Sequence, residues 1–174
     1  MKQTSKQATV VLLIDEYDRV CLARKKQAIH VGTTEISYSL GMYNGYGGKK
    51  EVTDLTIYHT AVRECYDESG VIVAIQDLND VAQVYFSKKN DLGEFEPFME
   101  VYFFFVSIYA GVPSEGVEMG PPVFFKQKDI PYEEMMPADE VLFKEMFSGK
   151  RNVYEVKLHG KDVAPEVLVI GELK

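Results

Sequence analysis

The sequence predicts an α+β fold, and three observations lead to that prediction. Short apolar runs typical of strands recur along most of the chain. Two segments, 54–69 and 136–147, have helical spacing instead. The strands do not alternate regularly with helices, as they would in a doubly wound parallel sheet. Because the chain has 174 residues and no linker-like stretch, we expect one domain over residues 1–174.

The expected strands begin with a continuous apolar run, Val10–Ile14, followed by a turn at 15–18 and a second strand, Arg19–Ala23. Gly93 and its polar neighbours indicate a hairpin tip later in the chain. The other strand-like runs are rich in β-branched and aromatic residues: Val71–Val73, Val81–Phe86, Phe98–Tyr109, Val123–Phe125, and a closing hairpin of Tyr154–Leu158 with Val167–Ile170.

The first helical segment ends at Ser69, and Gly70 stands where a helix stops in the left-handed conformation. Thr53 or Asp54 can cap its start. Its apolar residues recur at helical spacing and should form the buried face: Leu55, Tyr58, Val62 and Cys65. The second helix runs to Phe147, with Pro137 near its first turn.

Composition and charge exclude several classes of protein. Hydrophobic residues make up 46% and charged residues 26%, as in soluble globular proteins. The net charge of -8 argues against binding a nucleic-acid polymer. The apolar run before Asp15 is too short for a signal peptide or a membrane span. Cys21 and Cys65 have neither metal-ligand spacing nor a disulfide framework. We therefore expect a cytoplasmic protein without a membrane partner.

Three carboxylates on the first helix are the most informative feature. Glu64, Asp67 and Glu68 fall within an arc of roughly 100°, because each helical residue turns by about 100°. Like charges at this spacing repel one another, and a divalent cation such as Mg²⁺ or Mn²⁺ would remove the repulsion. The alternative is a solvated acidic face with no ligand.

A glycine-bearing stretch, 41–48, ends in Gly47-Gly48-Lys49 shortly before this helix. Glycines let a backbone approach an ion or a phosphate closely, and a lysine suits phosphate. The stretch lacks the Gly-Lys-Ser/Thr ending of a P-loop. A tight turn without a ligand is the alternative.

Together, Gly48 through Val71 resembles the signature of the Nudix hydrolase family. The segment 63–71, Arg-Glu-Cys-Tyr-Asp-Glu-Ser-Gly-Val, matches its second half, with Asp67 replacing a glutamate. The first half departs from the pattern. Asp54 stands where glutamate is expected, and one extra residue precedes Arg63. A lengthened loop before the helix would accommodate that insertion.

The resemblance extends over most of the chain to the MutT-homologue subgroup, which acts on oxidised purine nucleoside triphosphates. Its landmarks are the stretches 43–49, 99–104, 118–119, 130–132 and 136–139, and the hairpin 154–170. The resemblance implies a Nudix-type mixed-sheet α/β/α sandwich. It also implies hydrolysis of a nucleoside triphosphate to a monophosphate and pyrophosphate, with Mg²⁺ or Mn²⁺ as cofactor.

The resemblance also assigns residues to roles. The metal would be held by Glu64, Asp67, Glu68 and the carbonyl of Gly48. Glu64 would orient or deprotonate the attacking water, Arg63 would hold a carboxylate by a bidentate pair, and Glu118 would add a ligand or base.

For the substrate, the resemblance implies that Asn44 reads the base and Lys49 faces the phosphates. Tyr38, Met99, Met136 and Asp139 would line the base pocket. Asn44 has a second interpretation as a turn residue before Gly45, and Tyr38 and Met99 as core residues. Ala138 departs from the subgroup, which has an acid there, and Met136 replaces a tryptophan.

Three other functions remain open on the sequence. One is a Nudix hydrolase for another nucleoside diphosphate-linked compound, such as a nucleotide sugar or a dinucleoside polyphosphate. Another is a module that binds a nucleotide without hydrolysing it, although all three box positions keep carboxylates. The third is a scaffolding domain, which would leave the acidic arc unexplained.

Overall fold

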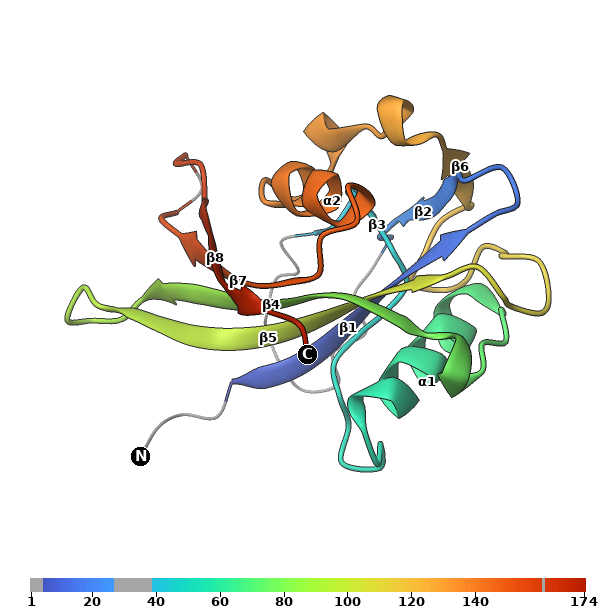
Figure 1. Cartoon of the computed structure of the whole chain (residues 1–174), viewed down its shortest axis with the longest axis horizontal. Coiled ribbons are helices and arrows are strands. Elements are labelled where there is room, and N and C mark those ends of the chain that lie inside the picture. The colour runs from blue at the N-terminus through green and yellow to red at the C-terminus, as the bar shows by residue number, and fades with distance from the viewer. Residues whose placement is uncertain (1–4, 27–38, 161) are drawn as a thin grey trace.

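The computed structural model describes residues 5–26, 39–160 and 162–174 (Figure 1). Its strands form one mixed sheet in the order β3-β2-β1-β5-β4-β7-β8, with β6 paired to β2. The pairs β1–β5 and β4–β7 are parallel, and the others are antiparallel. The strands are β1 (Lys6–Ile14), β2 (Val20–Arg24), β3 (Tyr43–Asn44), β4 (Asn79–Lys89), β5 (Phe95–Val106), β6 (Val123–Phe125), β7 (Asn152–Leu158) and β8 (Glu166–Glu172).

Two helices, α1 (Ile57–Ser69) and α2 (Asp139–Phe147), cover opposite faces of this sheet (Figure 1). Alternation along β1 explains the arrangement, because successive strand side chains point to opposite faces. Val11 and Leu13 pack in the same buried cluster as Cys65 of α1. Val10 and Leu12 pack in a second cluster with residues of α2. The expected α/β/α sandwich with a mixed sheet is confirmed.

The start of α1 differs from the sequence-based expectation. The N-cap is Thr56, whose hydroxyl accepts a hydrogen bond from the backbone N–H of His59. Neither Thr53 nor Asp54 caps the helix, because α1 begins at Ile57. Leu55 therefore lies before the helix with 83% of its surface exposed, and its predicted place on the buried face is wrong. The rest of that face packs as expected on the sheet.

Gly70 ends α1 as predicted, with a φ of 75° and its N–H donating to Tyr66. The chain after it does not form the expected strand at 71–73. Only Ile72 pairs, in a single bridge with Ala110, and a 3₁₀ helix follows at Ile75–Asp77. The side chains of Val71 and Val73 are buried in the cluster beneath α1. Their hydrophobicity therefore comes from core packing rather than from a strand.

The other boundaries shift by a few residues. β5 runs from Phe95 to Val106 instead of 98–109, because its pairing with β4 starts immediately after the hairpin that contains Gly93. Helix α2 begins at Asp139, two residues after Pro137, instead of at 136. The closing hairpin of β7 and β8 is confirmed as an antiparallel pair. No helix within the described ranges is long and apolar enough to cross a membrane.

Candidate active site

Residues 46–50 run alongside β1 and bring the glycines against its backbone. The backbones of Val11 and Tyr46 exchange hydrogen bonds of 2.6 and 3.0 Å, and the Thr9 N–H donates to the Gly48 carbonyl at 2.9 Å. A Cβ on Gly47 would lie 2.0 Å from the carbonyl oxygen of Thr9, so only glycine permits this approach. The stretch is therefore an extended segment paired with β1, rather than a tight turn.

Glu68 lies where this segment meets α1. Its side chain is only 5% exposed, and its Oε2 accepts a hydrogen bond of 2.8 Å from the backbone N–H of Gly47. The ammonium of Lys25 lies 3.9 Å from its Oε1. Burial raises the pKa of Glu68 to about 7, although the Gly47 N–H and Lys25 both favour its charged form. Glu68 is therefore a buried acid fixed against the glycine segment.

Glu64 lies one turn earlier on α1 and faces Gly48. A Cβ on Gly48 would lie 2.5 Å from the carboxyl carbon of Glu64, so the carboxylate fills the space that glycine leaves. Burial raises the pKa of Glu64, while the hydrogen bond from Arg63 lowers it. Negative charge on Asp67 and Glu118 adds to the upward shift. The carboxylate of Glu64 on α1 therefore interacts electrostatically with that of Glu118, which belongs to a segment distant in the sequence.

Arg63 connects these acids to the loop before α1. Its Nε and Nη2 donate to the two carboxylate oxygens of Asp54 at 2.9 and 2.8 Å. Its Nη1 donates to Oε1 of Glu64 at 2.8 Å. The bidentate partner is thus Asp54, which lies outside the expected ligand set, and Glu64 receives a single bond. The guanidinium holds the pKa of the buried Asp54 carboxyl well below its usual range.

The remaining predicted acids are more exposed. The Asp67 side chain is 57% exposed, with Oδ2 3.7 Å from Nη1 of Arg63. The Glu118 side chain is 32% exposed and belongs to a segment whose backbone pairs with the end of β2: the Lys26 N–H donates to the Glu118 carbonyl at 2.7 Å. Both side chains are more exposed than those of Glu64 and Glu68, which are 17% and 5% exposed.

Lys25 is a member of this site that the sequence analysis did not identify. Its ammonium lies 3.9 Å from carboxylate oxygens of both Glu68 and Glu118, and its side chain is only 18% exposed. The available signal was the run Arg24-Lys25-Lys26 directly after an apolar strand. Basic residues at the end of a strand are common, so that signal has little specificity on its own.

The donor chemistry of the site fits a hard divalent cation. Glu64 and Glu68 repel each other, and both have raised pKa values, so a cation would relieve an existing electrostatic cost. The Gly48 carbonyl accepts a bond from Thr9 and keeps a second lone pair. Among the described residues, no three His, Cys, Asp or Glu side chains converge closely enough to enclose a metal ion as they stand.

Met99 and Asp139, two of the residues expected to read the base, lie on the sheet face that α2 covers. Asn44 is in β3, where it pairs with Ala23 of the α1-side cluster, whereas its neighbour Tyr43 packs against the α2-side cluster. Met99 packs against the same cluster and pairs with Phe86. Asp139 is buried at the start of α2, where its Oδ2 accepts a bond of 3.2 Å from the Met136 N–H. Burial raises the pKa of Asp139 to about 7.

The remaining predicted substrate-binding residues are Asn44, Lys49 and Tyr38. The Asn44 amide oxygen accepts a hydrogen bond of 2.9 Å from the Gly45 N–H, as expected of a turn residue, and its NH₂ group is the part available to a ligand. Lys49 lies in the glycine segment, where its carbonyl accepts from Nη2 of Arg63 at 3.3 Å. Tyr38 lies outside the described residues.

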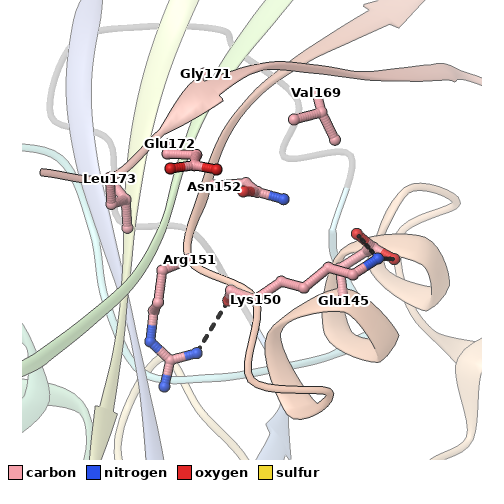
Figure 2. A pocket seen from close by; sticks show the side chains of 8 residues that line it. All are labelled: Glu145, Lys150, Arg151, Asn152, Val169, Gly171, Glu172 and Leu173. Atoms are coloured by element: carbon pink, nitrogen blue, oxygen red, sulfur yellow. Dashed lines mark hydrogen bonds and ion pairs between the residues drawn. The ribbon is translucent and has the colours of Figure 1, made fainter.

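An open cavity of about 680 Å³ lies away from these residues, between the end of α2 and the β7–β8 hairpin (Figure 2). Its lining contains none of the predicted site residues. Lys150 at its wall pairs with Glu145 at 2.9 Å, and Arg151 donates to the carbonyl of Lys150. The charges of Lys150 and Glu145 therefore satisfy each other, so this cavity presents no set of converging acids comparable to the site on α1.

Comparisons with known proteins agree with this geometry. The oxidized purine nucleoside triphosphate hydrolase of Danio rerio is 35% identical over 163 residues, which cover 94% of this chain and 93% of that protein. The protein of the same name from Mus musculus is 30% identical over 159 residues, covering 91% and 90%. The MutT protein of Bacillus halodurans has the same fold with a TM-score of 0.69 at 17% identity, over 93% of this chain and 97% of that one. No family model matches the chain.

Identity at this level extends over nearly the whole chain, and the sheet and the two helices have the arrangement that the family resemblance implied. The chain is therefore a pyrophosphohydrolase of the Nudix hydrolase family, in its MutT-homologue subgroup.

Proposed function

We propose that this protein hydrolyses a purine nucleoside triphosphate, with an oxidised guanine nucleotide as the favoured substrate, to the monophosphate and pyrophosphate. The observation that carries the proposal is a pair of acids packed against Gly47 and Gly48, the buried Glu68 and the partly buried Glu64. The names of the Danio rerio and Mus musculus relatives support the substrate class. The reaction would serve to remove damaged nucleotides from the cytoplasmic pool.

In this proposal Glu64, Asp67, Glu68 and the carbonyl of Gly48 hold Mg²⁺, or Mn²⁺ in its place. A bound divalent cation neutralises phosphate charge and lowers the pKa of a bound water. That contribution matters in this chain because its net charge of -8 repels a triphosphate. Lys25 adds positive charge beside Glu68 and Glu118, and Lys49 would face the phosphates.

The chain's own groups prepare the attacking water. Glu64 accepts its proton or orients it, and burial makes Glu64 a stronger base than an ordinary glutamate. Arg63 holds Glu64 in place while Asp54 anchors Arg63 from the other side. Glu118 supplies a further carboxylate, 3.9 Å from the ammonium of Lys25.

Recognition of the base uses groups that can donate hydrogen bonds. The Asn44 amide donates through its NH₂ group, and Asp139 can keep its proton near neutral pH because it is buried. Met99 and Met136 contribute apolar lining. Ala138 is buried and contributes no acid, which favours a base preference different from that of relatives with an acid there.

The test is pyrophosphate release with Mg²⁺ from a panel of ordinary and oxidised nucleoside triphosphates, nucleotide sugars and dinucleoside polyphosphates. Glu64→Gln and Glu68→Gln are the variants, and Glu140→Gln, on the exposed face of α2, is the matched control. We expect fastest turnover of an oxidised purine triphosphate, a loss of about 10²-fold or more in kcat for Glu64→Gln, and an unchanged control.

Preferential turnover of a nucleotide sugar or a pyrimidine triphosphate would leave the family unchanged and overturn the proposed substrate. Wild-type activity in Glu64→Gln would overturn the role of Glu64. Circular dichroism and urea unfolding of each variant separate loss of chemistry from loss of fold.

A further inference from the structure

The side chain of Arg24, the last residue of β2, contacts two segments that are distant in sequence. Its Nη1 donates to the carbonyl of Gly41 at 2.9 Å, and its Nη2 donates to the carboxylate of Glu134. Its guanidinium also stacks over the ring of Tyr43, 4.2 Å from the centroid. A planar guanidinium stacks on a ring by its face while its N–H groups donate in the plane, a geometry that a compact ammonium lacks.

Both contacted segments carry residues proposed to read the base. Tyr43 directly precedes Asn44 in β3, and Glu134 precedes the stretch that contains Met136 and Asp139. Tyr43 is itself fixed by an edge-on contact with Phe125, with ring centroids 5.3 Å apart. Movement of Glu134 relative to Tyr43 would therefore change the separation between β3 and the stretch that holds Met136 and Asp139.

We propose that Arg24, with Glu134 and Tyr43, sets the width of the base pocket and so acts as a positioning residue for base discrimination. The inference rests on the proposed function. Arg24 contacts the α2-side residues, whereas the next residue, Lys25, reaches Glu68 and Glu118 on the side of α1. Arg24 thus lies beside the segments that carry the residues proposed to recognise the base, and Lys25 lies beside the acidic site.

If this ion pair only stabilised the fold, its loss would lower the free energy of unfolding and leave base discrimination unchanged. The side chains of Arg24 and Glu134 are 42% and 43% exposed, and exposed pairs contribute little to the free energy of unfolding. Loss of this pair should therefore leave stability nearly unchanged. It should alter instead how the enzyme distinguishes one base from another.

The experiment measures kcat and KM for a purine and a pyrimidine nucleoside triphosphate in Arg24→Gln, Glu134→Gln and the double variant. The control is Lys150→Gln, which removes an ion pair of similar exposure at the distant cavity. We expect KM for the purine nucleotide to rise about three- to tenfold in each single variant, with kcat within about twofold of wild type. The double variant should be no worse than Arg24→Gln, because the two residues act as one unit.

Two further readouts address positioning directly. The purine-to-pyrimidine ratio of kcat/KM should fall in both single variants and not in Lys150→Gln. Arg24→Lys should restore only part of the ratio, because lysine keeps the positive charge but lacks the planar guanidinium with its two terminal donor nitrogens. Unchanged KM and unchanged ratio in an active Arg24→Gln variant would overturn the inference and leave the proposed function intact. Absence of triphosphate turnover in the wild type would overturn the proposed function, and the inference with it.

Discussion

Arg63 and Asp54, nine residues apart, form a bidentate ion pair with bonds of 2.9 and 2.8 Å. Asp54 is 7% exposed and also accepts hydrogen bonds from the Thr60 hydroxyl and the Glu51 N–H. The same guanidinium donates to Glu64 at 2.8 Å. The loop before α1 is thereby connected through one side chain to the acid proposed to act on water.

Asp54→Asn should reduce both stability and activity. Removing one charge leaves Arg63 without its bidentate partner in a partly buried site, which costs about 2–4 kcal/mol in the free energy of unfolding. Glu64 then loses its fixed position, so kcat should fall at least tenfold. Urea unfolding and steady-state kinetics measure the two effects. Glu140→Gln, in the exposed pair with Lys144, is the control and should cost less than about 1 kcal/mol.

The stability difference between wild type and Asp54→Asn should depend on pH, because the pKa of Asp54 is lowered in the folded state. The folded-state pKa of Asp54 lies below its ordinary value of 3.8, so the unfolded state takes up a proton first as the pH falls. The stability that the pair contributes is complete above about pH 5 and is lost progressively below about pH 4. The stability gap between wild type and Asp54→Asn should therefore narrow in acid. A gap that stayed constant down to pH 3 would contradict this account.

Gly48→Ala should affect the acidic site more than the fold. The new Cβ would lie 2.5 Å from the carboxyl carbon of Glu64, which must move away. We expect kcat to fall at least tenfold. The matched control is Gly120→Ala, whose Cβ would meet its nearest neighbour at 3.4 Å. Equal activity of the two variants would show that the position of Glu64 relative to Gly48 is unimportant.

Asp139→Asn should remove part of the pH dependence of stability. The pKa of Asp139 is raised from 3.8 to about 7, so the folded state holds a proton between these values that the unfolded state has released. Stability therefore decreases as pH rises from about 4 to 7, on the order of a few kcal/mol for this residue. Urea unfolding at pH 5 and pH 8 should give a smaller difference for Asp139→Asn than for wild type. An identical difference would mean that Asp139 ionises normally.

Mg²⁺ should stabilise the protein more at pH 8 than at pH 6. The buried Glu68 has a pKa of about 7, and a cation binds only the charged carboxylate, so binding at pH 6 must displace a proton. The apparent affinity should be about tenfold weaker at pH 6. Thermal unfolding with and without Mg²⁺ measures the shift in Tm at each pH. In Glu68→Gln, the shift should be small at both pH values, and a pH-independent shift in wild type would contradict the prediction.

Local spacing in the sequence was sufficient for several features. The carboxylates at 64, 67 and 68 share one side of α1 because helical geometry alone brings them together, and Gly70 ends the helix because of its own backbone freedom. Continuous apolar runs similarly predicted most of the strands. The family resemblance then predicted a mixed sheet between two helices, which the fold confirms.

Contacts between distant segments decided the cap of α1, the burial of Glu68 and the ion pairs at the end of β2. Thr56 rather than Thr53 or Asp54 caps α1, because Asp54 is drawn to Arg63, Thr60 and the Glu51 N–H. The burial of Glu68, and with it the raised pKa, arises only when the glycine segment pairs with β1 over α1. Lys25 and Arg24, adjacent in the sequence at the end of β2, contact different segments, Glu68 on α1 and Glu134 before α2. Sequence spacing determines which residues share an element, whereas burial and charge pairing depend on which elements meet, and only the tertiary structure decides that.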